Sequence, residues 1–416
     1  MNGGINMTKL KEQIERYADL IVQVGVQIQP GQRLVINASL DAADLVRLIA
    51  KKAYGAGARS VKVNWNDDTL ARLRYELAPD EAFLDEPKWY AGEMLELVQE
   101  GAAVISVVSS DPDLLKGVAQ ERIINHQKTY GKALSTYRQM MQSDKFSWCV
   151  VAAPSKAWAK KVFPGSTEEE QYSSLWTSIL KAVRADLDDP VAAWKEHIAS
   201  LNAKSEHLNS RKYKKLHYTA PGTDLTIELP EGHLWVAADS HNIQGNQFVA
   251  NLPTEEVFTA AKADGVSGYV SSTKPLSYGG TIIDNFKLTF ENGSVVKAEA
   301  EKGLAALEGL LEMDEGARRI GEVALVPYDS PISRSNILYF NTLFDENASN
   351  HLALGSAYAF NIEGGKGMSQ DELKEKGLNT SMTHVDFMIG SAEMDIDGIL
   401  EDGSLEPIFR GGNWAF

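Results

Sequence analysis

The chain has 416 residues, of which 44% are hydrophobic and 24% charged, and its 41 Lys and Arg against 57 Asp and Glu give a formal net charge of −16. This composition supplies enough apolar surface for a core, which excludes a disordered chain, and the length predicts two or three domains. Nucleic acids and anionic membranes bind surfaces with an excess of basic residues, so the acidic balance argues against both as partners.

Nothing near the start of the chain indicates export. Residues 1–7 contain no basic stretch followed by an apolar one, so we expect no signal peptide. No apolar run approaches the roughly 20 residues that a membrane helix needs. The single cysteine, Cys149, excludes an intramolecular disulfide bond and is typical of a reducing compartment. We therefore expect a cytoplasmic protein without a membrane segment.

Helix and strand patterns alternate through the first half of the chain. Apolar residues recur at helical spacing from Leu10 to Val22, which predicts a helix with Thr8 as its cap. The segments that follow are strands at 33–37, 60–65, 103–108 and 146–153 and helices at 41–54 and up to Gly101. Strand–helix–strand repeats predict a mostly parallel sheet covered by helices. The last of these strands buries Cys149, which argues against its use as a nucleophile.

Helices dominate from about residue 113 to 210. One of them is expected to begin with a capping box at 166–169, in which Ser166 and Glu169 satisfy each other's backbone amides. Beyond residue 215 the chain becomes rich in strands. These are predicted at 216–219, 224–229, 286–290 and 294–298, with hairpin turns at 291–293 and 402–403 and one helix at 301–319.

The change from alternating helices and strands to mostly strands predicts two domains, with the boundary in the polar stretch 204–215. We expect an N-terminal α/β domain, 1–210, with a mostly parallel sheet and helices. A strand-rich α+β C-terminal domain would follow, 211–416.

Several common catalytic motifs are missing. The chain has no Gly-x-Gly-x-x-Gly fingerprint and no P-loop, so the α/β half shows no sign of a dinucleotide or nucleotide site. It also lacks the His-Glu-x-x-His of zincins and the Gly-x-Ser-x-Gly nucleophile elbow. Ser271 and Lys274 match Ser-x-x-Lys, but in a strand context that is wrong for that nucleophile. Carboxylates and histidines in the second half remain as candidates.

The segment 383–390 is predicted to be a strand with one apolar face. His384 and Asp386 share the opposite face, with Cα atoms about 6.5–7 Å apart. An imidazole and a carboxylate so placed are able to reach a common metal ion. The alternative is an ordinary half-exposed strand, which this fragment alone favours.

Three further segments carry candidate side chains. Glu255 and Glu256 follow a Pro-Thr turn, and Glu322 stands beside a glycine at the mouth of an apolar strand. His351 is expected in a loop, with Tyr358 seven residues on. Each has a structural alternative: helix N-terminal acids for the first pair, a helix cap for Glu322, and a hydrogen-bonded loop histidine for His351.

Four motifs occur in one order and spacing: Asn251-Leu-Pro-Thr-Glu-Glu-Val-Phe258, Ile320-Gly-Glu-Val-Ala-Leu-Val326, Asn350-His-Leu-Ala-Leu-Gly-Ser-Ala-Tyr358 and Thr383-His-Val-Asp-Phe-Met-Ile-Gly390. Together they resemble the aminopeptidase T / aminopeptidase S family of metal-dependent peptidases. The likeness runs from about residue 8 to residue 416.

The resemblance implies a two-metal aminopeptidase that acts on peptides with a free N-terminus. It also implies a homodimer and a C-terminal domain that holds the metals. Tyr358 matches an active-site tyrosine. Either of the adjacent acids Glu255 and Glu256 is able to ligate the metal; we assign Glu256 to this role and Glu255 to that of a base or an amine contact. The implied metal ligands are Glu256, Glu322, His351, His384 and Asp386.

The chemistry of this set is coherent. Three carboxylates offset three of the four positive charges of two divalent ions, and Glu322 is the expected bridge between them. Nitrogen and oxygen ligands without thiolate suit Zn²⁺, Co²⁺ or Mn²⁺ alike. Tyr358 is expected to donate a hydrogen bond to the oxyanion of the tetrahedral intermediate.

Two other classes remain as alternatives. One is another dinuclear metallohydrolase, such as a dipeptidase or an amidase. The other is a non-catalytic two-domain protein that binds a small ligand between its domains.

Overall fold

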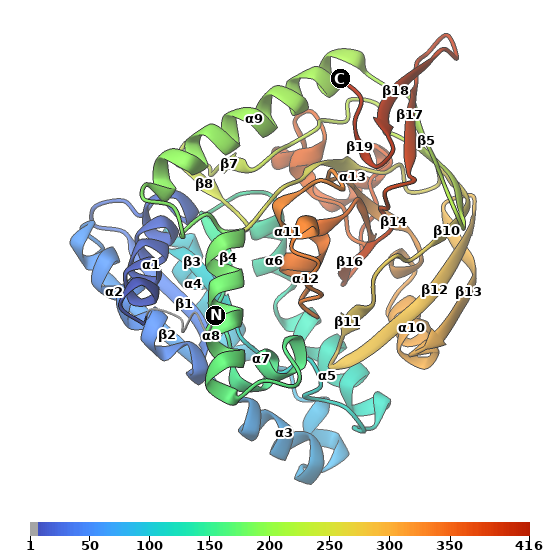
Figure 1. Cartoon of the computed structure of the whole chain (residues 1–416). Coiled ribbons are helices and arrows are strands. Elements are labelled where there is room, and N and C mark those ends of the chain that lie inside the picture. Colours follow the sequence, from blue (N-terminus) through green and yellow to red (C-terminus); the bar gives the residue numbers. More distant parts are fainter. Residues whose placement is uncertain (1–6) are drawn as a thin grey trace.

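The computed structural model describes residues 7–416, and it confirms the predicted fold class. A parallel sheet with helices forms the N-terminal part, and antiparallel sheets form most of the C-terminal part (Figure 1). No helix within the described residues is both long and apolar enough to cross a membrane.

The first sheet has four parallel strands in the order β2-β1-β3-β4. All four were predicted from the sequence, and their bounds are β1 (Arg33–Ser39), β2 (Ser60–Asn66), β3 (Ala103–Val108) and β4 (Trp148–Ala152). The helices of this half are α1 (Met7–Leu20), α2 (Ala43–Gly55), α3 (Asp68–Leu77), α4 (Lys88–Gln99), α5 (Gln120–Ala133), α6 (Ser135–Gln142), α7 (Lys156–Val162), α8 (Glu168–Ala182) and α9 (Pro190–Arg211).

Two predicted helix caps were wrong by a small shift. Helix α1 already includes Met7, so Thr8 lies within it rather than before it. The capping box of α8 is formed one residue later than predicted. Thr167 accepts a hydrogen bond from the Glu170 amide, and the Glu170 carboxylate accepts one from the Thr167 amide, so the pair still satisfies two free donors.

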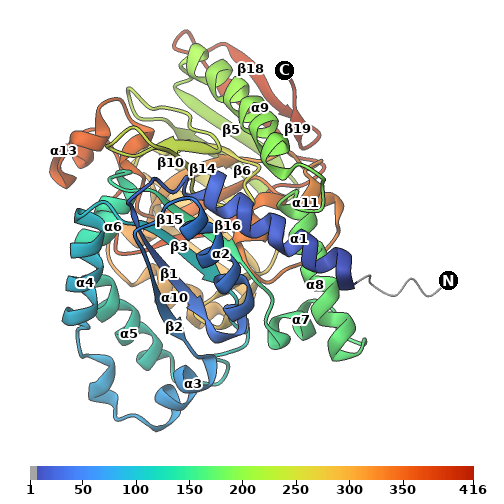
Figure 2. The same ribbon diagram turned by 90° about the vertical axis from the view of Figure 1, so that its left-hand side faces the viewer.

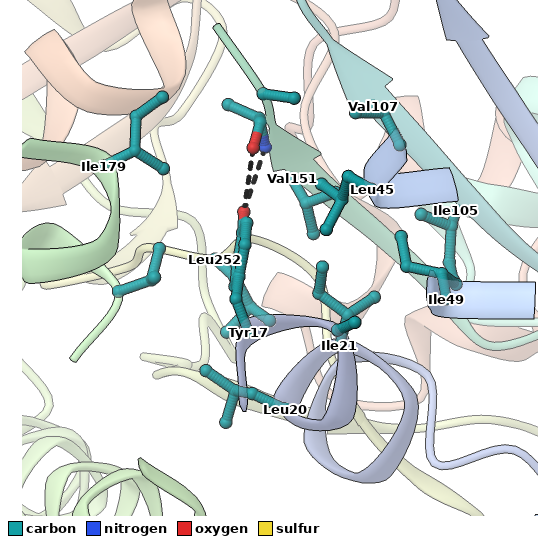
Figure 3. Packing of buried hydrophobic residues seen from close by; sticks show 14 of the residues in the cluster. Tyr17, Leu20, Ile21, Leu45, Ile49, Ile105, Val107, Val151, Ile179 and Leu252 are labelled. Atoms are coloured by element: carbon teal, nitrogen blue, oxygen red, sulfur yellow. Dashed lines mark hydrogen bonds between the residues drawn. The ribbon is translucent and has the colours of Figure 1, made fainter. Parts of the chain in front are cut away.

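The N-terminal core packs α1 and α2 against the parallel sheet (Figure 3). Tyr17 is fully buried, and its hydroxyl donates to the Ala152 carbonyl at 3.3 Å and accepts from the Ala152 amide at 3.1 Å. Leu252, from the second half of the chain, packs into the same cluster beside it. The segment around Leu252 is therefore fixed against β4 as well as against its own half of the molecule.

The largest antiparallel sheet has the order β11-β12-β10-β6-β5-β17-β18-β19, with β13 also paired to β12. The two predicted hairpins are confirmed, with Asn292 and Gly293 at positive φ in the first turn. The strands are β5 (Lys215–Ala220), β6 (Thr223–Glu228), β10 (Val266–Ser271), β11 (Leu276–Tyr278), β12 (Thr281–Glu291), β13 (Ser294–Lys302), β17 (Asp395–Ile399), β18 (Leu405–Arg410) and β19 (Asn413–Trp414).

The helix predicted at 301–319 is shorter than expected. Strand β13 extends to Lys302, and α10 spans only Leu304–Leu311. The Asp314 carboxylate accepts hydrogen bonds from the Ala317 and Met382 amides, which starts a separate 3-10 turn and ends the helical run. The remaining helices are the short α11 (Pro331–Arg334), α12 (Thr342–Asp345) and α13 (Gln370–Glu375).

The predicted domain boundary remains a prediction. Helix α9 continues without a break through the first part of the polar stretch 204–215 and ends at Arg211. Figure 2 shows α9 extending from the region of α1 to the strands near the C-terminus. Trp194 of α9 belongs to the N-terminal core, whereas Leu208 belongs to the core of the second half. The helix thus contributes to both cores.

The third sheet positions the candidate site. It has four antiparallel strands in the order β16-β15-β14-β9. They are β9 (Val257–Ala260), β14 (Ile320–Leu325), β15 (His351–Gly355) and β16 (His384–Met388). A separate ribbon pairs β7 (Asp239–His241) with β8 (Gln247–Val249).

Candidate metal centre

The third sheet brings all five predicted metal ligands together. Glu256 directly precedes β9, Glu322 lies in β14, His351 begins β15, and His384 and Asp386 lie in β16. Two groups of side chains form, Glu256–Glu322–His351 and Glu322–His384–Asp386, and in each the possible ligand atoms lie within 4.8 Å of one another. Glu322 is the member that the two groups share.

The distances within the two groups are short. His351 Nε2 lies 3.0 Å from Glu256 Oε2 and 3.7 Å from Glu322 Oε1. His384 Nε2 lies 3.6 Å from Glu322 Oε2 and 3.4 Å from Asp386 Oδ1. The two oxygens of Glu322 therefore face different histidines, one on each side of the carboxylate.

A β-bulge and a glycine position Glu322. The register between β14 and β15 shifts between Ile320 and Glu322, and a bulge of this kind changes the direction of a side chain next to a site. A Cβ atom at Gly321 would come within 2.3 Å of the Gly355 carbonyl oxygen, so only glycine allows the two backbones to approach this closely.

A small residue separates the carboxylates across the sheet. Ala353 of β15 pairs with Glu322 on one side and with Asp386 on the other. Directly paired residues point to the same face, with Cβ atoms about 4.5–5.5 Å apart. The methyl group of Ala353 thus leaves open the space between the two acids.

Backbone carbonyls orient both histidines. His351 Nδ1 lies 3.0 Å from the Glu346 carbonyl oxygen, and His384 Nδ1 lies 2.7 Å from that of Ser356. A carbonyl only accepts, so each Nδ1 carries a proton and each Nε2 faces the carboxylates, where it holds a second proton unless a metal ion takes that proton's place. Metal-binding histidines are commonly held in this manner. The structure corrects the predicted loop position of His351, because strand pairing on both sides makes it part of β15.

Burial makes this concentration of charge costly without cations. Burial and the neighbouring Asp386 and Glu256 carboxylates raise the pKa of Glu322 to about 7. Although burial lowers it, the pKa of His384 is raised to about 10 by Asp386 and Glu322. The buried Asp386 Oδ1 makes no hydrogen bond within the described residues, although His384 Nε2 lies 3.4 Å away. Protons or metal ions must supply the compensating charge, and this oxygen without a hydrogen bond and the oriented histidines fit metal ions.

Glu346 is a further acid at the site that the sequence analysis missed. It lies in the 3-10 turn Glu346–Ala348, is only 6% exposed, and lines the same cavity as the predicted ligands. Burial and the nearby Asp386 and Glu256 carboxylates raise its pKa well above the usual range. Its sequence context, Asp345-Glu-Asn347, is typical of an ordinary surface turn. Only its position five residues before His351 could have indicated that it lies at the site.

The two adjacent acids enter different environments. Glu256 contacts His351 and lines the cavity, whereas Glu255 Oε1 lies 2.8 Å from Arg184 Nη1 and Oε2 lies 3.1 Å from Nη2. Neither acid is in a helix, because both lie in the irregular segment that precedes β9, so the alternative of helix N-terminal acids is wrong. The role predicted for Glu255, as a base or an amine contact, remains a prediction.

Aromatic side chains close one side of the site. The ring of Tyr358 lies 4.8 Å from that of His384 and stacks on Phe360 at 4.9 Å. The cavity that the proposed ligands and Tyr358 line has a volume of about 60 Å³. Its apolar walls include Val236, Ala237, Ala238, Phe258 and Phe360. Tyr358 is therefore placed between the acidic cluster and an apolar recess.

The chain is similar to known proteins over almost its whole length. Residues 10–414 match the family described as thermophilic metalloprotease (M29). Aminopeptidase AmpS of Bacillus subtilis is 62% identical, over 99% of this chain and 100% of the relative. Aminopeptidase T of Thermus thermophilus is 43% identical, over 98% and 100%. The solved structure of wild-type AmpT from Thermus thermophilus superposes with a TM-score of 0.90 at 42% identity, covering 98% of this chain and 100% of that one.

Proposed function

The chain belongs to the thermophilic metalloprotease family M29 and is a metallo-aminopeptidase, and we propose that it removes residues one at a time from the free N-terminus of peptides with two divalent metal ions. The observation that carries the two-metal proposal is the pair of ligand groups that share Glu322. One ion would be held by Glu256, Glu322 and His351, and the other by Glu322, His384 and Asp386.

The ions, when bound, would supply Lewis acidity and a water of lowered pKa. The chain supplies the remaining groups. Tyr358, in contact with His384, is positioned to donate a hydrogen bond to the developing oxyanion. Glu346 belongs to neither ligand group but lines the same cavity, so we assign it the role of proton acceptor in preference to Glu255, which pairs with Arg184. Bound cations would offset the neighbouring carboxylates that raise the pKa of Glu346 and so leave it free to accept a proton.

The nature of the metal and the assembly state are part of the proposal. The oxygen and nitrogen ligands suit Zn²⁺, Co²⁺ and Mn²⁺, and metal analysis of the purified protein would distinguish them. The family resemblance supports a homodimer, which light scattering would test. The composition supports a cytoplasmic location, which fractionation of cells would test.

A timed digest tests the reaction. An unblocked peptide should lose residues one at a time from its N-terminus, as mass spectrometry would show. The N-acetylated peptide should have a kcat/KM lower by at least about 10²-fold, because a capped amine loses both its charge and its anchoring in an acid-rich site. Internal cleavage, or equal rates on both peptides, would favour the alternative of a general metallohydrolase. Activity that survives removal of the metal by EDTA would refute the metal requirement.

A further inference from the structure

A larger cavity adjoins the metal centre. Its volume is about 580 Å³, and residues of α5, of α6 and of the segment that leads into β16 line it. Tyr358 and His384 line both this cavity and the small recess at the metal centre. A peptide held at the metal centre would therefore have room for its later residues in the larger cavity.

The lining of the larger cavity differs from that of the metal centre. Among the described residues that line it, none is Asp or Glu, and Arg138 is the one Arg or Lys. Burial and the nearby Arg74 lower the pKa of His126, which favours its neutral form. Neutral hydrogen-bonding side chains make up much of the wall, among them Gln127, Ser135, Gln139, Gln142, Ser381 and Thr383. In a chain of net charge −16, a cavity with one cation and no carboxylate is suited to an anionic group.

Arg138 is held in place without an acidic partner. Its Nη1 donates to the Met382 carbonyl oxygen at 3.0 Å. Gly131 of α5 leaves room for the guanidinium, since a Cβ atom there would lie 3.3 Å from Nη1. Within residues 7–416 no Asp or Glu forms an ion pair with Arg138, and burial lowers its pKa. A guanidinium has five donors, so one bond to a carbonyl leaves it able to bind a carboxylate through two.

The position of Arg138 sets the length of peptide that would reach it. Met382 precedes His384 by two residues, so their Cα atoms are at most about 7 Å apart. A guanidinium bonded to the Met382 carbonyl therefore lies in the same cavity as His384 and close to it along the chain, so a peptide of only a few residues would reach from one to the other.

We propose that Arg138 binds the C-terminal carboxylate of a short peptide whose N-terminus is at the metal centre, and thereby gives the enzyme a preference for peptides of a few residues with a free C-terminus. The proposal rests on the proposed aminopeptidase function, since it assigns the leaving part of the substrate to the larger cavity. The same guanidinium would also bind the carboxylate of an acidic side chain. The test therefore distinguishes a C-terminal carboxylate from a side-chain carboxylate.

The test compares three substrates with the same first residue: a tripeptide with a free C-terminus, its carboxamide, and a carboxamide with Glu as third residue. An aminoacyl p-nitroanilide, which has no carboxylate, reports the basal reaction. The variants are Arg138→Gln and Arg138→Lys. The matched control is Lys132→Gln on the exposed side of α5, where Lys132 pairs with Glu86 and does not line the cavity.

For the wild type, kcat/KM on the free tripeptide should exceed that on its carboxamide by about 10-fold or more, mainly through KM. Arg138→Gln should abolish this preference and leave the anilide rate within about 2-fold, Arg138→Lys should retain part of the preference, and Lys132→Gln should retain all of it.

Recovery of the preference by the Glu-containing carboxamide would show that side-chain carboxylates bind equally, which would overturn the specificity for the C-terminus. Equal loss on all substrates in Arg138→Gln, or no preference in the wild type, would overturn the proposal. Absence of any cleavage of the anilide and the free tripeptide would instead refute the aminopeptidase function itself.

Discussion

Glu255 and Glu256 are neighbours in the chain, but their carboxylates contact different parts of the molecule. Glu256 Oε2 lies 3.0 Å from His351 Nε2 at the acidic cluster, whereas Glu255 forms a two-point ion pair with Arg184. Arg184 in turn lies over the ring of Trp194, in the N-terminal core. The ion pair therefore connects the segment that carries a proposed metal ligand to the N-terminal half of the molecule.

The first prediction concerns this ion pair. Arg184→Met leaves the buried Glu255 without its cation, which should destabilise the protein by about 3 kcal/mol and weaken metal binding by displacing Glu256. Glu255→Gln keeps a hydrogen-bonding partner for Arg184 and should cost less. Denaturant unfolding and metal titration would measure both effects. If Glu255→Gln lost turnover with stability and metal affinity intact, Glu255 would be a base or an amine contact, as first predicted from the sequence.

The second prediction concerns Glu322 as the bridge. Its two carboxylate oxygens face His351 and His384, so Glu322→Gln removes a charged ligand from both proposed sites at once. Metal content per chain should fall towards one or none, and turnover should be lost. Elemental analysis after dialysis gives the metal content. A variant with two tightly bound metals and a near-normal rate would exclude the bridge.

The third prediction concerns the space beside Ala353. Ala353→Leu places a larger side chain between Glu322 and Asp386 and should reduce metal content. Overpacking in a buried strand should also cost about 1–3 kcal/mol of stability. Ala353→Ser is the matched control, because it adds one hydroxyl group and should bind both metals. Full metal content in the leucine variant would show that the metals do not occupy this space.

The fourth prediction concerns Tyr358. Tyr358→Phe removes one hydroxyl group and keeps the ring contacts with His384 and Phe360. If the hydroxyl stabilises only the oxyanion, kcat should fall by about 10²–10³, with metal content unchanged. Steady-state kinetics on one peptide, with metal analysis of the same sample, decides the point. A rise in KM alone would make Tyr358 a wall of the substrate pocket.

Short-range sequence patterns were sufficient for most of the fold and for part of the site. The strand at 383–390, with His384 and Asp386 on one face, follows from alternation with period two, which depends only on neighbouring residues. The four parallel strands, three of them continuous apolar runs, and both hairpins, marked by their Asn-Gly and Asp-Gly turns, were likewise predictable from neighbouring residues. The combination of the five ligands came from the family resemblance, since no local pattern links residues spread from position 256 to position 386.

Other features depended on the tertiary structure. The Glu346 carboxylate is buried at the site because distant strands surround its turn, and Glu255 faces Arg184 because α8 ends beside the segment that precedes β9. The bulge at Glu322 and the pairing of Ala353 with two acids are properties of strand register. The sequence by itself determined which residues are able to bind metal and which segments form strands. Burial and register, which arise only when remote segments pack together, decided which acids face one another.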